Sequence, residues 1–430
     1  MSLLPHAGIG WGLQTNKPME ASPVRVTTLL NKLLRLPGLW VRGFHLESEV
    51  LVIRIVPRFR RLTCPACGTR VQGRFSQSQR RWRHLALWGL RVELVGPIRR
   101  LRCPRCRKVR TEEVPWARAG SRFTRPFEDV VGLLAQQLNH TAVSQMMGIS
   151  WSTVGEIARR LVAEGLDERR FDGLRRIGVD ELRYGSPHRF LTLVLNHDTG
   201  RVVWAAEGKN SETLKSFFEL LGPERLAQIE VASIDMSAAY QKALRENLPD
   251  VAVVFDKFHL ARLAQRALDQ VRRSLVRRLP PEQRRPLKNT RWALLKSPEN
   301  LDPAQQGKLA SIQRTNEPLY RAYLLKESFL DLLAGSSVEE TRAELEAWLA
   351  WASRSRLRPF VRLARTVRKH LDGILQMVQT GLSNARLEGT NNKVRLLSHR
   401  AYGFHSAAPL IATIYLCCSG LDLQVPMPLL

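Results

Sequence analysis

The chain has 430 residues, enough for about three domains of ordinary size. Its 67 Lys and Arg outnumber its 39 Asp and Glu, which gives a formal net charge of +28. Because this charge is spread along the chain, we expect nucleic acid as the partner in preference to a membrane surface. No apolar stretch reaches the roughly 18 residues of a membrane span, and the N-terminus lacks the pattern of a secretory signal.

The N-terminal part is predicted to be a metal-binding module. Residues 1–24 are rich in Gly and Pro and suggest a poorly ordered leader, followed by a zinc-binding domain over 25–112. This domain is expected to contain a helix at 29–34 and strands at 50–56 and 90–95. Two CxxC pairs complete a four-sulfur site that favours one structural Zn²⁺, whereas redox-active or metal-free thiols are the alternative. The ligands would be Cys64, Cys67, Cys103 and Cys106.

A helix-turn-helix domain is predicted over residues 113–170. Three helical segments lie between Phe127 and Glu164, and the third begins near Ser150 or Ser152. Thr153 and Glu156 have the spacing of a capping box near its start. A plain three-helix bundle would give the same pattern, but the basic charge and the neighbouring cysteine module favour DNA binding. The residues expected to face the major groove are Ser152, Thr153, Arg159 and Arg160.

The pattern changes to strands over residues 171–260. Strand-like runs occur at 177–182, 190–195, 201–206, 229–234 and 251–255. Helices precede and follow the fourth run, and we interpret Ser211 and Ser237 as their N-caps. This order predicts the first part of a ribonuclease-H-like core, a mixed sheet flanked by helices. The fold class is therefore multidomain, α+β or α/β.

Residues 261–380 read almost entirely as helix and are rich in Arg and Lys. We interpret them as a basic helical insertion, after which residues 381–430 supply the final helices of the core. The first part of the insertion, from Arg262 to Lys296, is expected to contact DNA phosphates without regard to sequence. The arginines expected to make these contacts are Arg272, Arg273, Arg277 and Arg278.

Three carboxylates stand out by position: Asp180 in the first strand, Asp235 after the fourth strand, and Glu388 on a late helix. Taken singly, each could be a surface acid or a helix-cap partner. Taken together, they can converge and hold hard cations through oxygen ligands. Two such cations activate one oxygen and stabilise another during phosphodiester cleavage. We therefore predict a site for two Mg²⁺ or Mn²⁺ ions formed by these three residues.

Neighbouring polar residues are candidates for supporting roles. Asn391 and Asn392 follow Glu388 by one helical turn, where they could orient a metal-bound water or be surface amides only. His259 could orient a carboxylate or the scissile phosphate, with Asp256 beside it, or be a packed core histidine. Glu181 should point to the opposite face of the sheet from the preceding Asp, and we interpret it as structural.

From about residue 62 onward, the chain resembles bacterial insertion-sequence transposases of the IS-L-three family. The resemblance lies in the CxxC pairs, the helix-turn-helix, and the strings GVDE, SIDMSAAY, DKFHLA and NARLEGTNNKVR followed by RAYGF. It implies a ribonuclease-H-like core with the three carboxylates as catalytic metal ligands, and a D-x-x-H element matched by Asp256 and His259. It also implies double-stranded DNA as substrate, namely the element's inverted repeats and a target, handled by a homodimer or larger assembly.

Two other classes of protein share parts of this pattern. A domesticated, non-catalytic DNA-binding regulator would keep the zinc and helix-turn-helix modules but lose an acidic residue of the triad, which is intact here. A ribonuclease-H-like nuclease or resolvase would share the core without needing both modules. We therefore predict a Mg²⁺-dependent DNA transposase that is cytoplasmic, nucleoid-associated and not bound to a membrane.

Overall fold

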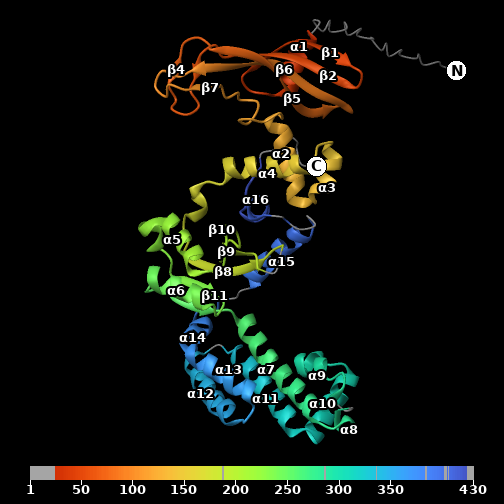
Figure 1. The fold of residues 1–430 in the computed structure, drawn as a ribbon, viewed down its shortest axis with the longest axis vertical. Coiled ribbons are helices and arrows are strands. Elements are labelled where there is room, and N and C mark those ends of the chain that lie inside the picture. The colour runs from red at the N-terminus through yellow and green to blue at the C-terminus, as the bar shows by residue number, and fades with distance from the viewer. Residues whose placement is uncertain are drawn as a thin grey trace, which may run out of the picture. The chain divides into compact units, whose positions relative to one another are not determined.

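The computed structural model describes residues 25–185, 188–284, 287–335, 337–382, 385–400, 404 and 406–423. The predicted leader at 1–24 and the Ala-Tyr-Gly at 401–403 lie outside the described residues. The chain forms two compact units, residues 1–130 with 425–430, and residues 131–424 (Figure 1). None of the described helices is both long and apolar enough to cross a membrane.

The first unit is built around a five-stranded sheet. Helix α1 (Val26–Leu34) precedes β1 (Leu39–Glu47), β2 (Val50–Pro57), β5 (Ser76–Leu87), β6 (Leu90–Arg102) and β7 (Val109–Thr111). The strand order is β1-β2-β6-β5, and β7 pairs with β6. Buried Trp82, Leu94 and Trp116 belong to its core. The helix, β2 and the beginning of β6 confirm the predictions, whereas β5 was missed because its sequence is mostly polar.

A group of three helices follows: α2 (Arg125–Gln137), whose residues from 131 onward belong to the second unit, α3 (His140–Met147) and α4 (Trp151–Gly165). Helix α3 ends at Gly148, whose φ of 57° is left-handed. Ser150 is the N-cap of α4, and its side chain accepts a hydrogen bond from the Thr153 N–H. The predicted capping box of Thr153 and Glu156 is therefore wrong, because the helix begins one turn earlier.

A second five-stranded sheet follows, with order β10-β9-β8-β11-β12. Its strands are β8 (Arg176–Arg183), β9 (Phe190–Asn196), β10 (Val202–Glu207), β11 (Val231–Ile234) and β12 (Ala252–Phe255). Strands β8, β9 and β10 are antiparallel, whereas β11 runs parallel to both β8 and β12. All five predicted strand runs are confirmed.

Helices α5 (Ser211–Leu226) and α6 (Ala238–Asn247) connect the later strands. The N-cap of α5 is Asn210, whose side chain accepts from the Thr213 N–H, so the prediction of Ser211 as the cap is wrong by one residue. Ser237 occupies the N-cap position of α6 as predicted, but its side chain makes no capping hydrogen bond. Its backbone N–H instead donates to Asp235 Oδ1 at 2.9 Å.

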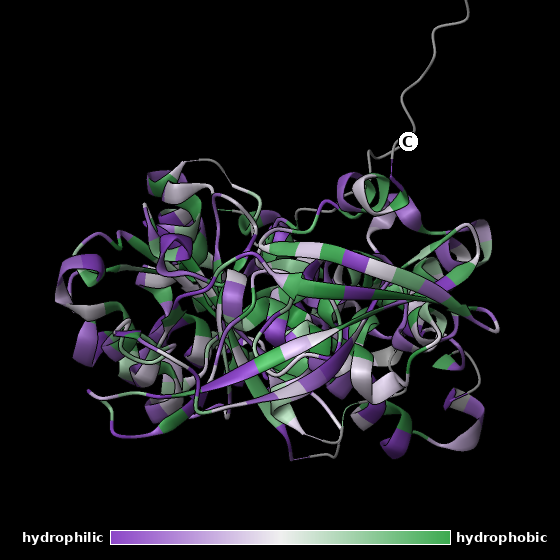
Figure 2. Ribbon diagram, turned by 90° about the horizontal axis from the view of Figure 1, so that it is seen from above, coloured by the Kyte–Doolittle hydropathy of each residue, from purple (hydrophilic) through white to green (hydrophobic). Residues whose placement is uncertain are grey.

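The insertion is helical, as predicted. Its main helices are α7 (Lys257–Arg278), α10 (Pro303–Thr315), α11 (Glu317–Leu332), α12 (Val338–Arg354), α13 (Arg358–Lys369) and α14 (Leu371–Thr380), with short α8 (Pro281–Arg284) and α9 (Arg291–Leu295). One buried core runs from the sheet into these helices. Figure 2 shows hydrophobic and hydrophilic residues interleaved along single helices, as one-sided burial requires.

Two C-terminal helices, α15 (Ala385–Arg400) and α16 (Ala407–Cys418), return to the sheet and the first helices. The Tyr415 hydroxyl of α16 accepts a hydrogen bond from the Ala205 N–H of β10 at 2.9 Å. Gln136 of α2 donates to the Leu416 carbonyl at 2.9 Å. Helix α16 therefore connects the helix-turn-helix group to the edge of the sheet.

We predict that Gly373→Ala destabilises the second unit. A Cβ at Gly373 of α14 would lie 2.4 Å from the ring of Phe255 and 3.2 Å from the Val253 carbonyl. Overpacking of this kind costs about 1–3 kcal/mol. Calorimetry should show a lower Tm. The matched control is Gly307→Ala in α10, which meets no atom within 4 Å and should stabilise its helix by up to about 1 kcal/mol. An unchanged Tm for Gly373→Ala would contradict the packing.

Candidate functional site

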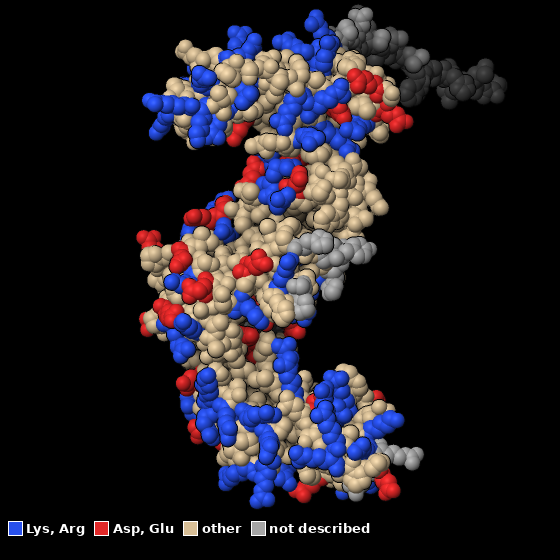
Figure 3. All heavy atoms as spheres, viewed as in Figure 1, with Lys and Arg blue, Asp and Glu red and all other residues tan. Residues whose placement is uncertain are grey.

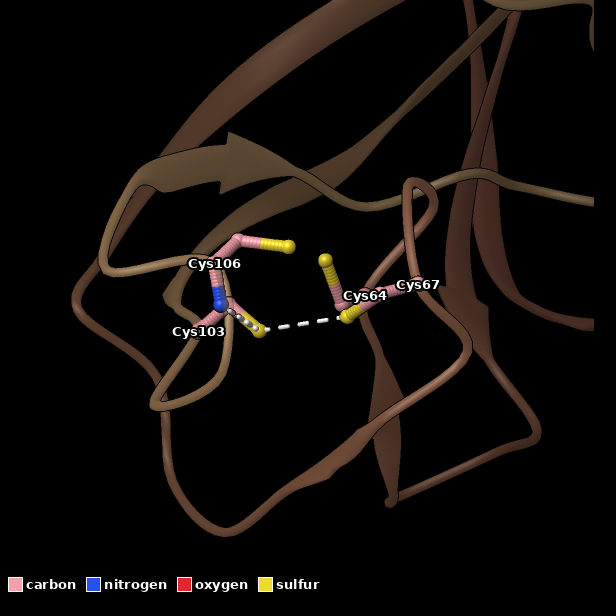
Figure 4. Close-up of side chains that lie close together, drawn as sticks. All are labelled: Cys64, Cys67, Cys103 and Cys106. Atoms are coloured by element: carbon pink, nitrogen blue, oxygen red, sulfur yellow. Dashed lines mark hydrogen bonds between the residues drawn. The ribbon is translucent and has the colours of Figure 1, made fainter.

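The four cysteines of the CxxC pairs converge in the first unit (Figure 4). Their sulfur atoms lie within 4.8 Å of one another, and Cys67 Sγ is 3.5 Å from Cys103 Sγ. Hydrogen bonds with the side chain and backbone of Thr69 lower the pKa of Cys67 to about 6, which favours the thiolate form that binds metal. Four sulfurs in this arrangement suit tetrahedral Zn²⁺ and leave no open position for catalysis.

Matching turns hold the two cysteine pairs. The Gly68 N–H donates to the Cys64 carbonyl and the Arg107 N–H to the Cys103 carbonyl, each at 2.9 Å. Both donor residues have left-handed φ values, 70° and 53°. A left-handed residue other than glycine costs roughly 1–2 kcal/mol, so the second turn is kept at some conformational cost. The repeated geometry explains how two distant sequence motifs form one cluster.

A row of aspartates crosses the carboxyl edge of the second sheet. Strand β11 lies between β8 and β12 and runs parallel to both. Continued to the strand ends, this register places Asp235 between Asp180 of β8 and Asp256, which follows β12. Burial raises the pKa of Asp180 to about 6, and the negative charges of Asp235 and Asp256 contribute to the increase. The structure thus brings two residues of the predicted triad together.

Asn391 of α15 contacts the first of these aspartates. Its side-chain NH₂ donates to Asp180 Oδ2, and the Glu181 N–H donates to Asp180 Oδ1 at 2.7 Å. Asn391 is only 3% exposed, and its own Oδ1 is buried without a partner among the described residues. Asn392 is exposed and accepts from Arg395 instead, at 3.1 Å. Of the two predicted amides, only Asn391 reaches the aspartates.

Glu388 lies one turn before Asn391 on α15, with its side chain exposed. Among the interactions of the described residues, none joins Glu388 to Asp180 or Asp235. Carboxylates repel one another unless cations lie between them. The structure therefore places Glu388 on a late helix, as predicted, but does not bring it into contact with the other two carboxylates, and its role as third ligand stays a prediction.

Helix α15 is held on β8 by contacts that the sequence did not reveal. A Cβ at Gly178 of β8 would lie 3.2 Å from Leu387 Cδ1 and 2.9 Å from His197 Nε2, so glycine permits the close approach. Arg386 donates to the His197 carbonyl at 2.9 Å. The buried His197 ring bonds Ser233 Oγ of β11 at 2.6 Å, and burial lowers the pKa of His197 to about 4. These contacts fix the helix that carries Glu388.

Asp256 and His259 form a pair at the beginning of α7. Asp256 is the N-cap and accepts from the Phe258 N–H, and its other oxygen lies 2.6 Å from His259 Nδ1. This hydrogen bond raises the pKa of His259, against the opposing effect of burial. Asp256 therefore holds the His259 ring in one orientation, and the predicted role of His259 in orienting a carboxylate or a phosphate stays a prediction.

A cavity of about 470 Å³ opens at this edge of the sheet. Its lining includes the carboxylates of Asp235 and Glu181 together with His259. It also includes three cationic side chains, Lys209, Arg262 and Arg266. Glu181 was predicted to be structural, but the structure places it in the lining of the same cavity as Asp235. Carboxylates that can bind cations thus lie beside cationic side chains that can bind phosphates.

The predicted DNA-contacting residues differ in exposure. On α4, Ser152 and Arg159 are exposed, whereas Thr153 and Arg160 are half-buried, and Arg160 already interacts within the protein. On α7, two arginines share one acid: Asp269 accepts from Arg272 at 2.7 Å and from Arg273 at 2.7 Å. Arg277 and Arg278 are exposed. Two of the four predicted phosphate contacts are therefore partly neutralised within the protein.

Comparisons with known proteins agree with these features. A transposase family profile matches residues 177–414, the helix-turn-helix domain of transposase family ISL3 matches 112–162, and the zinc-finger of transposase IS204/IS1001/IS1096/IS1165 matches 60–106. The zinc-finger match and the four-cysteine cluster together support a structural zinc.

Two relatives align with most of the chain. The transposase for insertion sequence element IS1557 of Mycobacterium tuberculosis (strain CDC 1551 / Oshkosh) is 38% identical over 401 residues, covering 87% of this chain and 90% of the relative. The transposase for insertion sequence element IS1001 of Bordetella parapertussis is 28% identical over 384 residues, covering 87% and 94%. The chain therefore belongs to the ISL3 family of insertion-sequence transposases, DNA-binding enzymes that cleave and transfer DNA.

Proposed function

We propose that this transposase binds the terminal inverted repeats of its own insertion sequence and catalyses metal-dependent cleavage and strand transfer. The observation that carries the proposal is the placement of Asp180 beside Asp235 at the edge of the sheet, next to a cavity with three cationic side chains. The strand order and directions support a ribonuclease-H-like core. The intact acidic residues favour an enzyme over a non-catalytic regulator.

Asp180, Asp235 and Glu388 would hold two Mg²⁺ or Mn²⁺ ions. When bound, such ions activate the attacking oxygen and stabilise the leaving oxygen. The donor set fits hard cations, because it consists of carboxylates. Asn391 lies beside it, and its buried Oδ1 has no partner among the described residues. Asn391 also fixes the orientation of Asp180 by donating to its Oδ2.

The remaining residues of the cavity would position the DNA strand. Asp256 orients His259 through Nδ1, so Nε2, which makes no hydrogen bond to another described residue, would bind a phosphate oxygen. Arg262 and Arg266 lie one turn apart on α7 and supply two guanidinium groups for neighbouring phosphates. Lys209 Nζ lies 3.6 Å from the centroid of the Phe190 ring, which limits its freedom.

DNA recognition is assigned to the N-terminal half. The exposed Ser152 and Arg159 of α4 would reach base edges in the major groove, and the zinc-binding domain would contact the same element end. We assign domains to residues 25–112, 113–170, 171–260, 261–380 and 381–430. Because strand transfer requires both element ends to be held together, we infer a homodimer or larger assembly on DNA.

Replacing the acids should abolish chemistry while preserving DNA binding. Asp180→Asn, Asp235→Asn and Glu388→Gln each remove one charge and nearly keep the side-chain shape. Nicking of a labelled element end in Mg²⁺ should fall by orders of magnitude, because two cations cannot be held together without these oxygens. The matched control is Glu230→Gln at the other end of β11, where an exposed carboxylate pairs with Arg175 at 3.4 Å.

Normal nicking by the Glu388→Gln protein would refute the assignment of the third ligand. Glu181 would then be the next candidate for the third metal ligand, because it lines the same cavity as Asp235. For that reason Glu181→Gln is not a suitable neutral control, although Glu181 was predicted to be structural.

The zinc should be structural and present once per chain, because four thiolates complete its coordination. Cys64→Ser should release the metal, unfold the first unit and weaken end binding, since metal binding is coupled to folding. Elemental analysis and circular dichroism provide the measurements. Cys417→Ser, which lies outside the cluster, should retain the metal. A folded, DNA-binding preparation without zinc would contradict the assignment.

Arg159→Ala should reduce the preference for the element end by about 1–3 kcal/mol, the value of a bidentate base contact. The measurement is a competition between the end sequence and random duplex DNA of the same length. Arg160→Ala serves as the comparison, because that side chain is half-buried and held within the protein. An equal loss of affinity for both duplexes in the Arg159→Ala protein would show that α4 does not read bases.

A further inference from the structure

The helical insertion contains a second cavity, of about 690 Å³, away from the aspartate row. It lies between the C-terminal part of α7 and the beginning of α13. Five arginines line it, and all five are exposed: Arg278, Arg356, Arg358, Arg362 and Arg365. We call this feature the arginine groove. Its described lining contains no acidic residue, so its charge is of one sign.

The arginines of the groove differ from their neighbours on α7. Within the described part of the chain, no ion pair joins any of the five to an acid, whereas Arg272 and Arg273 share Asp269. Like charges gathered in one concave surface repel one another and raise the local positive potential. An unbalanced group of this kind is suited to an anionic ligand carrying several charges.

The groove has a regular and supported geometry. Arg358, Arg362 and Arg365 follow one another at helical spacing along the exposed face of α13, whose opposite face is buried through Phe360, Leu363, Ala364 and Val367. Arg362 also donates to Gln270 of α7 at 3.0 Å, which connects the two walls. Figure 3 shows Lys and Arg side chains gathered over this helical region.

The extent of the groove suits a repeating phosphate chain. Arg358 and Arg365 are seven steps apart on α13, which corresponds to a rise of about 10 Å. One strand of B-DNA carries a phosphate about every 3.4 Å along the helix axis, so duplex DNA of that length offers more than one phosphate to the three side chains. A single small anion would neutralise only part of the five charges, whereas a sugar-phosphate backbone could place several phosphates beside different arginines.

We propose that the arginine groove binds the backbone of double-stranded DNA without regard to sequence, as a second DNA-binding surface distinct from α4 and from the aspartate row. This proposal depends on the proposed function in one respect: it takes DNA as the polyanion that binds the groove. Its contacts would hold DNA in place while the element end is recognised elsewhere. The sequence prediction placed phosphate contacts between Arg262 and Lys296 and named four arginines of α7, whereas four of the five groove arginines lie in the loop before α13 and on α13 itself.

The test is a salt titration of duplex binding without added Mg²⁺, so that no cleavage enters the measurement. The variant carries Arg358→Gln, Arg362→Gln and Arg365→Gln together. Each lost phosphate contact lowers the slope of log K against log salt by about 0.9, so the triple variant should lose about 2.7. The loss should be the same for an element end and for random duplex DNA.

The matched control removes equal charge outside the groove, at exposed Arg245, Arg314 and Arg342. It should leave the slope nearly unchanged. A triple substitution of the groove arginines by lysine should retain most of the slope. An unchanged slope in the glutamine variant, an equal loss in the control, or a loss confined to the element end would each overturn the proposal.

Two further measurements separate an effect on folding from an effect on DNA binding or cleavage. The Tm of the glutamine variant should stay close to that of the unsubstituted protein, because relief of like-charge repulsion offsets the loss of the hydrogen bond from Arg362 to Gln270. If the triple variant does not fold, the single substitutions should each lower the slope by about 0.9. Asp235→Asn should leave the slope unchanged, and nicking at saturating DNA should survive in the groove variant. Failure of the groove and failure of the proposed catalytic site would therefore give different results.

Discussion

The parallel pairing of β11 with β8 on one side and β12 on the other is the constraint on which the proposed site depends. This register places Asp235 between Asp180 and Asp256 at one edge of the sheet. Burial raises the pKa of Asp180, and repulsion by the negative charges of Asp235 and Asp256 adds to the increase. Such an arrangement is unfavourable in isolation and becomes favourable when divalent cations bind, which is the expected design of a metal-dependent nuclease or transferase site.

The remaining parts of the second unit hold this edge in place. Gly178 lets α15 approach β8 closely, and Gly373 lets α14 pack against Phe255 of β12. The long insertion thus returns to the sheet it interrupts, and one buried core includes both. Cationic side chains extend from the cavity beside Asp235 to the arginine groove of α7 and α13. The acidic edge and the basic surfaces are consequently parts of one folded unit.

Local patterns in the sequence predicted what depends on local physics. The five strands of the second sheet alternate or run apolar, and the paired cysteines have the spacing of a shared metal, so both were predicted. Strand β5 was missed because only Trp82 and His84 among its residues are buried. The partnership of Arg272 and Arg273 with Asp269, and the exposure of Glu181 to the cavity, depend on side-chain placement that spacing does not determine. The packing of α15 against Gly178 and His197 could not be predicted either, because it depends on contacts between segments that are far apart in the sequence.

The most direct test of the central claim is to locate the cations themselves. Fe²⁺ can replace Mg²⁺ at oxygen-ligand sites, and with a peroxide and a reductant it cuts the polypeptide backbone beside the bound ion. Fragment mapping by mass spectrometry should show cuts near Asp180, near Asp235 and on α15 near Glu388, and excess Mg²⁺ should suppress all three. Cuts near Asp180 and Asp235 without any on α15 would contradict the account. So would cuts at the beginning of α12, where Glu339 and Glu340 would then be the candidates for the third ligand.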